Sequence, residues 1–226
     1  LNVNATAATG ASLAELQIQG TKTFGSATPS ENLALEGNAY VSGLDANNDM
    51  TGDKAVDGNT GTRWTGNFMK NGVDYDSWIV VDLGDDVESI SEISMEFYNL
   101  VWPTDFVVQV AGNAFTPVDY STQNIGSNVT NQAAFSGQNG AGADCWTTIR
   151  AYTGLSLNAH PTITLSSSEF EAAVPDGTRY IRLYFTGMNG SAAGHSIGLK
   201  ELTVTGTRTA APASPDVASG AASTAS

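Results

Sequence analysis

Short runs of alternating apolar and polar residues recur along this chain, and turn residues separate them. The clearest are SWIVVDLG at 77–84, ISEISMEFY at 90–98, DFVVQVAG at 105–112 and RYIRLYFTG at 179–187. A period of two in β-branched and aromatic residues, broken by Gly, Asn, Asp and Pro, is typical of half-buried strands. The pattern therefore predicts an all-β sandwich whose helices are few and short.

Composition narrows the classes of partner. Hydrophobic residues make up 41% of the 226 residues, which is enough to build a core, and 9 Lys+Arg against 23 Asp+Glu give a net charge of -14. Nucleic acids and anionic lipids are bound through clustered Lys and Arg, so we expect neither as a partner. Cations and neutral ligands fit better. The single cysteine, Cys145, leaves no internal disulfide and is expected to be a small buried residue beside Trp146.

The chain divides into a central module and two flanks. Residues 31–207 hold the strand patterns, and 208–226 are rich in Ala, Ser and Pro, as linkers are. Residues 1–30 contain SLAELQIQGTKT, which repeats the pattern of GLKELTVTGTRT at 198–209. They are either the tail of a preceding module with a linker or an extra N-terminal strand of the same sandwich.

The sequence contains no run of about 18 apolar residues, so we expect no membrane insertion. The Gly-, Ala-, Ser-, Thr- and Asn-rich composition favours an exported bacterial protein, so we expect an extracellular or cell-surface location.

The segment AVDGNTGTRWTGNFM at 55–69 carries the strongest functional signal. Asp57 and Asn59 offer hard oxygens beside Gly58, which tolerates the positive φ of a tight ligating turn. Trp64 is placed to anchor this turn to a core. The alternative is that Asp57 and Asn59 only cap the turn through side-chain hydrogen bonds.

Seven segments together resemble the coagulation factor type C, or discoidin-like, domains, most closely the family 32 carbohydrate-binding modules. In family order they are ENLALEG (31–37), KAVDGNTGTRW (54–64), SWIVVDLG (77–84), ISEISMEFY (90–98), FVVQVAG (106–112), TRYIRLYF (178–185) and GLKELTVTG (198–206). The resemblance implies a galactose-binding-domain-like jelly-roll β-sandwich, a structural calcium ion, and a binding face built by loops at one end.

The same resemblance implies the calcium ligands. They are the carbonyl of Lys54, the side chain of Asp57, the carbonyl of Asn59, Thr62 through hydroxyl and carbonyl, Glu201, and a nearby carbonyl such as that of Leu199. A second acidic stretch, LDANNDMTGD at 44–53, superficially matches an EF-hand loop. Met50 stands where that loop needs Gly and Val56 where it needs Glu, so we expect a solvated loop.

A sugar site needs an exposed aromatic platform and a few planar hydrogen-bonding groups. Trp64, Trp78 and Trp146 are expected in the core. Trp102 precedes Pro103 between two strands, and is either the platform or a packed lid on the end of the sandwich. The family's loops add the remaining candidates, which are Phe68, Asp74, Tyr75, Asn99, Asn189 and His195.

These features predict a non-catalytic, calcium-containing carbohydrate-binding module of a multi-modular protein, whose parent could itself be a glycosidase. The expected partner is a glycan containing galactose or an N-acetylhexosamine, besides neighbouring modules of the same chain. Many galactose-binding relatives place an Arg near the position of Asn99, and this chain has none there. The sequence contains no hydrolase elbow, zinc-protease or phosphate-loop motif. The alternative function is a protein-binding or adhesion module, or a spacer, with the same fold. The stretch from 113 to 144 is expected to be a long inserted loop.

Overall fold

The computed structural model describes ten stretches of the chain. They are residues 29–35, 37–43, 50–67, 69–70, 73–74, 77–100, 102–113, 145–157, 162–189 and 196–209, with the backbone alone described at 67, 69–70, 73–74 and 196. Within these stretches no helix is long and apolar enough to cross a membrane. The predicted 113–144 loop and the echo at 12–23 lie almost wholly outside the described residues.

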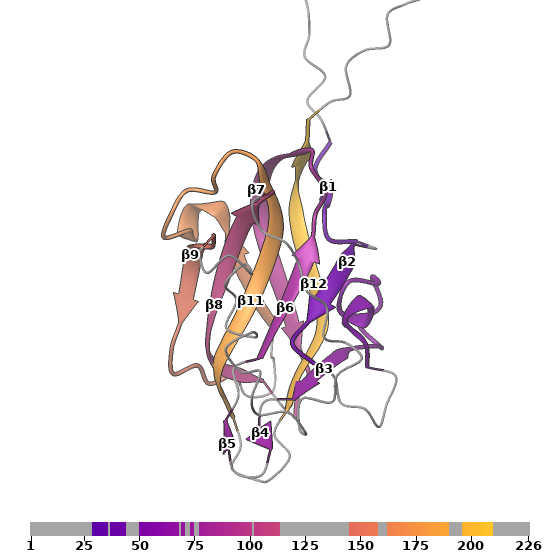
Figure 1. The fold of residues 1–226 in the computed structure, drawn as a ribbon, viewed down its shortest axis with the longest axis vertical. Helices are drawn as coiled ribbons and strands as arrows, with labels where there is room; N and C mark the ends of the chain where they lie inside the picture. The colour runs from indigo at the N-terminus through magenta and orange to yellow at the C-terminus, as the bar shows by residue number, and fades with distance from the viewer. Residues whose placement is uncertain are drawn as a thin grey trace, which may run out of the picture.

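Two antiparallel five-stranded sheets form the molecule (Figure 1). The first has the order β1-β12-β7-β10, with β3 also pairing β12. Its strands are β1 (Glu31–Asn32), β3 (Trp64–Asn67), β7 (Val87–Phe97), β10 (Thr162–Ser166) and β12 (Ser196–Arg208). The second has the order β2-β6-β11-β8-β9. Its strands are β2 (Asn38–Val41), β6 (Ser77–Asp82), β8 (Pro103–Gly112), β9 (Thr147–Tyr152) and β11 (Thr178–Met188).

The remaining elements are short. A two-stranded sheet joins β4 (Met69–Lys70) to β5 (Val73–Asp74). Two 3-10 helices are described, η1 (Gly52–Ala55) and η4 (Ser167–Glu169). The prediction of an all-β sandwich with few short helices is therefore confirmed. The predicted solvated loop at 44–53 is wrong at its end, because η1 begins at Gly52; residues 44–49 lie outside the description.

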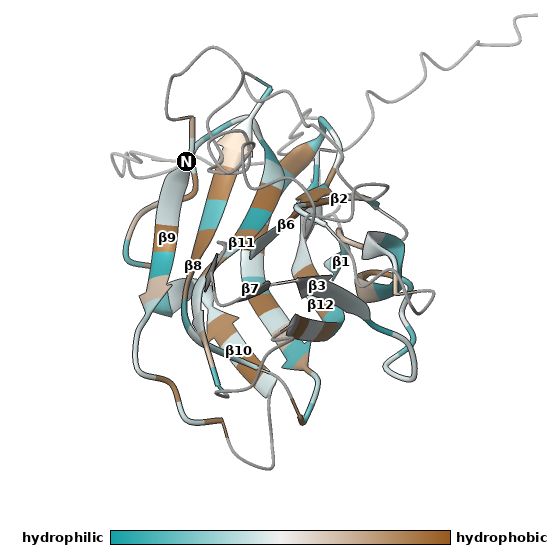
Figure 2. Ribbon diagram, turned by 60° about the horizontal axis from the view of Figure 1, so that its bottom comes forward, coloured by the Kyte–Doolittle hydropathy of each residue, from teal (hydrophilic) through white to brown (hydrophobic). Residues whose placement is uncertain are grey.

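The core lies between the two sheets, as the alternation of apolar and polar bands along β8 and β11 indicates (Figure 2). Phe97 from one sheet meets Phe106 and Phe185 from the other, with ring centroids 5.8 and 6.2 Å apart. Trp64 is fully buried and donates its indole N–H to the carbonyl of Gly43 at 3.1 Å. Edge-to-face aromatic packing of this kind stabilises the sandwich beyond simple area burial.

A second apolar cluster covers the opposite face of the β6, β8 and β11 strands. It contains Trp78, Val80, Ala111, Trp146 and Tyr180, with Cys145 half-buried beside it. Trp78 and Trp146 are thus buried as predicted, but they lie outside the core between the sheets. Cys145 was expected to be buried and is half-exposed.

The two ends of the sandwich differ in what they carry. At one end β6 finishes, β7 starts and β12 finishes, because Tyr180 pairs with Asp82 and Arg208 with Val87. At the other end β7 turns into β8 through residues 98–102, beside the last residues of β11. Figure 1 shows the second end at the bottom, near β4 and β5.

Candidate functional site

The segment after η1 folds into a tight turn held by its own side chains. Gly58 has φ 73°, a value that favours glycine. Asp57 Oδ1 accepts the backbone N–H of Asn59 at 2.9 Å, and Asn59 Oδ1 accepts that of Gly61 at 3.0 Å. Asp57 and Asn59 therefore do cap the turn, as the alternative interpretation expected. These caps do not explain the other oxygens that the turn brings together.

The hydroxyl of Thr62 lies among these other oxygens. Its Oγ1 is 2.8 Å from Asp57 Oδ2, 3.0 Å from Asp57 Oδ1, 2.7 Å from the carbonyl oxygen of Asn59 and 3.5 Å from that of Lys54. A hydroxyl has one proton and can satisfy one acceptor fully. The turn therefore gathers more acceptor oxygens than it has donors to satisfy.

Glu201 brings a second carboxylate to this turn from β12. Its side chain is 8% exposed, and neither carboxylate oxygen has a hydrogen-bond partner among the described residues. Burial raises the pKa of Glu201 to about 7, and the charges of Asp57 and Glu96 also raise it; the backbone N–H groups of Gly58 and Asn59 lie close enough to lower it, but neither makes a hydrogen bond of normal geometry to the carboxylate. These influences place the Glu201 carboxylate against the Asp57–Asn59 turn. We call Lys54, Asp57, Asn59, Thr62 and Glu201 the oxygen cluster.

Nearby cationic side chains are directed elsewhere. Lys54 Nζ lies 3.6 Å from Asp53, and Lys200 pairs with Glu96. The guanidinium of Arg63 lies 4.0 Å from the centre of the Tyr98 ring, with its Nε donating to Thr65 Oγ1 at 3.2 Å. No described Lys or Arg therefore neutralises the two carboxylates of the oxygen cluster.

A hard divalent cation fits this arrangement. Calcium takes six to eight oxygen ligands and accepts carboxylate, carbonyl and hydroxyl oxygens together. The oxygen cluster offers all three kinds, including the two orphaned oxygens of Glu201. In the described part of the chain no group of three or more His, Cys, Asp or Glu side chains is placed to hold a metal ion, so the oxygen cluster rests on two carboxylates with carbonyl and hydroxyl oxygens. Leu199 lies on β12 with its side chain in the core, and its carbonyl as a ligand stays a prediction.

The turn between β7 and β8 is clamped from a distance. Asn189, at the end of β11, accepts the N–H of Trp102 on Oδ1 at 2.7 Å and donates Nδ2 to the carbonyl of Leu100 at 3.5 Å. Its own backbone N–H donates to the carbonyl of Trp102 at 3.1 Å. These contacts fix the turn, so Asn189 acts first as a positioning residue. Whether it also contacts a ligand stays a prediction.

Trp102 packs partly against the core, as the lid alternative implies, while its role as a sugar platform stays a prediction. Its side chain is half-buried and packs against the core cluster, so part of the indole closes the end of the sandwich while part remains accessible. Asn99 and Leu100 of the same turn are exposed, Leu100 at 65%. The structure thus brings Trp102, Asn99 and Asn189 together.

The other predicted ligand residues are not placed in the same way. Asp74 lies on β5, where its backbone pairs with Met69, and its side chain is not described. Phe68, Tyr75 and His195 lie outside the described residues. Their membership of the site remains a prediction.

Sequence reasoning missed two features of this end. Leu100 is an exposed apolar residue in a turn, and its position between two strand patterns was the available signal. Arg63 follows the predicted calcium turn directly in the sequence, and its guanidinium stacks on Tyr98, the residue before Asn99. The chain therefore has an Arg near Asn99 in space although it has none there in sequence. Only the folded β3–β7 arrangement reveals this contact.

Comparison with known proteins places the fold. Residues 54–143 match the family model described as NedA-like, galactose-binding domain, of the F5/F8 type C group. Chitosan-binding module 1 of a chitosanase/glucanase from Paenibacillus sp. IK-5 superposes with a TM-score of 0.51 at 21% identity, covering 77% of this chain and 98% of that one. Module 2 of the same enzyme, in complex with chitotriose, gives 0.51 at 24% identity over 76% and 98%. No curated protein matches the chain. The predicted resemblance to discoidin-like, coagulation factor type C domains is therefore confirmed over residues 54–143.

Proposed function

We propose that this chain is a non-catalytic carbohydrate-binding module, and that it meets its glycan at the end of the sandwich formed by the β7–β8 turn. The observation that carries the proposal is the clamped Trp102, an aromatic ring that is partly exposed on a turn fixed by Asn189. The description of the matching family as a galactose-binding domain supports it, and so do the two chitosan-binding modules with a similar fold.

The chemistry of this turn suits a sugar. A pyranose ring offers an apolar C–H face and a rim of hydroxyls, which pair with an aromatic ring and planar amides. Trp102 supplies the ring and Asn99 an exposed amide. Because hydrogen bonds to neutral hydroxyls exchange with those to water at small net gain, we expect a Kd on the order of micromolar to millimolar. Galactose or an N-acetylhexosamine is the proposed sugar, and neighbouring modules would add avidity.

Calcium is proposed as a structural ion held by the oxygen cluster. The orphaned carboxylate oxygens of Glu201 and the four acceptor oxygens around the Thr62 hydroxyl support this assignment. Bound calcium would supply positive charge between η1 and the last strand. The protein's own part is to converge main-chain and side-chain oxygens from Lys54 to Thr62 on Glu201.

Export from the cell and membership of a larger, multi-modular protein belong to the same proposal. The low content of charged residues, 14%, and the Ala-, Ser- and Pro-rich segment at 208–226 support it. So does the origin of the two structural neighbours, which are modules of an enzyme that acts on polysaccharide.

Glycan-array binding with and without a calcium chelator tests the proposal. We expect Trp102→Ala to lower the affinity for the bound glycan at least roughly tenfold, because the platform contact is lost. Trp102→Phe keeps a ring against the core and should retain part of the affinity, which separates binding from packing. Thermal unfolding of both variants is the control for folding. An array without any hit, or full binding by Trp102→Ala, would favour the alternative of a protein-binding or spacer module.

A further inference from the structure

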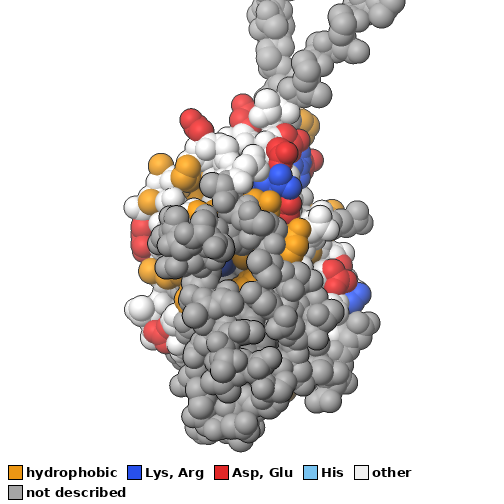
Figure 3. Space-filling view, in the orientation of Figure 1, with side chains coloured by type: hydrophobic (Ala, Val, Ile, Leu, Met, Phe, Trp, Pro, Cys, Tyr) orange, Lys and Arg blue, Asp and Glu red, His pale blue; other side chains and the backbone are white. Residues whose placement is uncertain are grey.

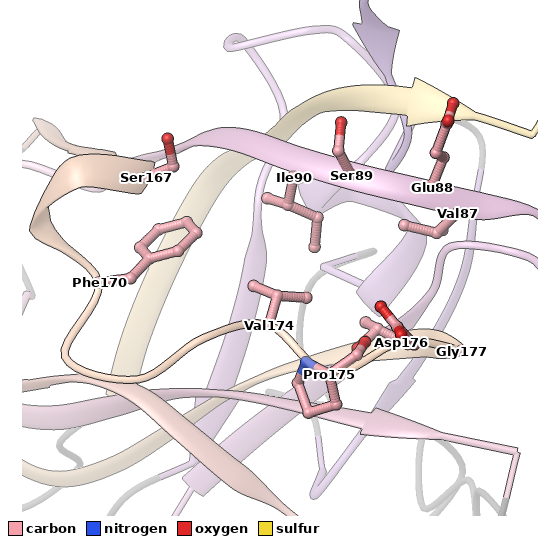
Figure 4. A pocket seen from close by; sticks show the side chains of 11 residues that line it. Val87, Glu88, Ser89, Ile90, Ser167, Phe170, Val174, Pro175, Asp176 and Gly177 are labelled. Carbon is pink, nitrogen blue, oxygen red and sulfur yellow. The ribbon is translucent and has the colours of Figure 1, made fainter.

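A cavity opens at the end of the sandwich opposite the β7–β8 turn. Its volume is about 450 Å³, and it lies between the first residues of β7, η4 and the segment 170–178 that leads into β11 (Figure 4). Sites for small molecules typically measure about 300–1,000 Å³. The cavity is thus large enough for one sugar ring or a molecule of similar size.

Apolar side chains form part of the walls of this cavity. Ile90 on β7 and Val174 on the facing segment point toward each other, and Phe170 enters from the side of η4 (Figure 4). Phe170 and Val174 are half-buried, so the ring of Phe170 remains partly accessible. An accessible aromatic face beside aliphatic groups is the kind of surface on which the C–H face of a sugar ring packs.

The rim of the cavity is acidic. Asp176 lines it on the side of Val174, Glu88 belongs to the lining through β7 with its carboxylate directed away from Val174, and no Lys, Arg or His is among the lining residues (Figure 4). Arg208, whose strand pairs with the start of β7, uses its guanidinium on Glu31 and Asp86. A ligand that suits this rim therefore carries positive charge.

We propose that this cavity is a second binding site, for an amino sugar with a free ammonium group. The ring's C–H face would lie against Phe170 while the ammonium meets the carboxylate of Asp176. A lysine side chain has the same charge, but it loses more rotamer freedom on binding than a rigid pyranose does. This difference favours the sugar over a basic peptide.

The second site is separate from the glycan site proposed above. Ile90 and Tyr98 lie eight residues apart on and after β7, which corresponds to roughly 25 Å of extended chain. One sugar ring cannot reach both places. The two proposals therefore succeed or fail independently.

Methyl NMR of the full chain, titrated with chitotriose (the glucosamine trimer), tests this proposal. We expect shifts at the methyl groups of Ile90 and Val174, which persist in Trp102→Ala. Asp176→Asn should weaken this binding about tenfold, as expected for a lost charge-assisted contact. Glu92→Gln is the control, because Glu92 is an exposed carboxylate on β7, the strand that carries Ile90, and it does not line the cavity. It should bind as the wild type does.

The comparison ligand is the N-acetylated trimer, which keeps the ring and removes the charge. Binding at least roughly tenfold weaker than that of chitotriose supports the role of the ammonium. Equal binding of both trimers, absence of methyl shifts, or loss of the shifts in Trp102→Ala would each overturn the proposal. So would a trilysine peptide that shifts these methyl groups more strongly than chitotriose does.

Discussion

Carboxylates are treated differently in two regions of this molecule. At the turn that joins β6 to β7, Asp82 accepts Nε and Nη2 of Arg179 at 2.8 and 2.7 Å, and Asp85 pairs with the same guanidinium. Asp86 accepts Nη1 of Arg208 at 2.5 Å. Figure 3 shows acidic and basic side chains side by side at this end of the molecule. Here the chain supplies its own cations.

The oxygen cluster has no such partners. Asp57 and Glu201 approach each other, Glu201 is almost fully buried, and the nearby Lys54, Lys200 and Arg63 are engaged elsewhere. Burying a charged carboxylate without a partner costs on the order of several kcal/mol, unless the group is protonated or a cation binds to it. The contrast teaches that none of the described basic residues serves this place, so the Glu201 carboxyl group either stays protonated, as its raised pKa allows, or meets an external cation, as proposed above.

The largest expected effect is on the response to calcium. At a calcium concentration one hundred times its Kd, the wild type should gain about 2.7 kcal/mol of unfolding free energy over the chelated protein. Glu201→Gln should lose most of this gain, because it removes a ligand charge. In chelator at pH 8 the same variant should be as stable as the wild type or more so, since it removes a buried, unpartnered charge. Thermal unfolding in calcium and in chelator measures both.

Glu96→Gln is the matched control for that experiment. Glu96 lies opposite Glu201 across the β7–β12 pair and is bound to Lys200. Its variant should keep the full calcium response. A calcium-induced stabilisation that survives in Glu201→Gln would show that the oxygen cluster is not where the ion binds.

The next largest effect is expected when the guanidinium of Arg179 is removed from the turn between β6 and β7. Arg179→Met leaves Asp82, whose side chain is 9% exposed, with the backbone N–H of Gly84 as its remaining donor among the described residues. We expect a loss of about 2 kcal/mol in the free energy of unfolding, equal in calcium and in chelator. Asp85→Asn, at an exposed partner of the same guanidinium, should cost less than about 1 kcal/mol. Urea denaturation measures both values, and a calcium-dependent loss in Arg179→Met would contradict the separation of the two regions.

The same ion pair predicts how stability depends on acid. Partial burial raises the pKa of Asp82, but the hydrogen bonds from Arg179 and Gly84 and the charge of Arg179 outweigh it and hold the pKa below its usual value of 3.8. The stabilisation is therefore complete above this value and is lost as the pH falls through the lower pKa of the folded protein. The unfolding free energy should fall more steeply below pH 4 in the wild type than in Arg179→Met. Parallel acid profiles would contradict this expectation.

Local sequence patterns predicted the fold more completely than they predicted the candidate glycan site. The strands at 77–84, 90–98, 105–112 and 179–187 were predictable because their period of two lies within a few residues. Most of the oxygen cluster, from Lys54 to Thr62, is contiguous in the sequence, and its members were named from the resemblance to discoidin-like domains. Trp102 was found from its Pro neighbour, but the clamp by Asn189 joins residues 87 positions apart.

The cavity at the opposite end shows the same limit. Its lining comes from the start of β7, from η4 and from the segment before β11, and each piece alone looks like an ordinary strand start or turn. Arg63 likewise follows the predicted calcium turn in the sequence, whereas in the fold its guanidinium stacks on the ring of Tyr98. Contacts of this kind depend on how the sheets pair, which period and composition do not encode.

The smallest expected effect tests which atom of a residue matters. Lys54 enters the oxygen cluster through its carbonyl, which lies 3.5 Å from the Thr62 hydroxyl, while its ammonium pairs with exposed Asp53. Lys54→Met keeps that carbonyl and removes the charge, so calcium affinity should change by less than about threefold, upward if at all, because a nearby positive charge is lost. Calorimetric titration with calcium measures this change, with Asp57→Asn as the variant that should bind far more weakly. A large loss in Lys54→Met would mean that the lysine side chain, and with it the local backbone of η1, sets the position of the cluster.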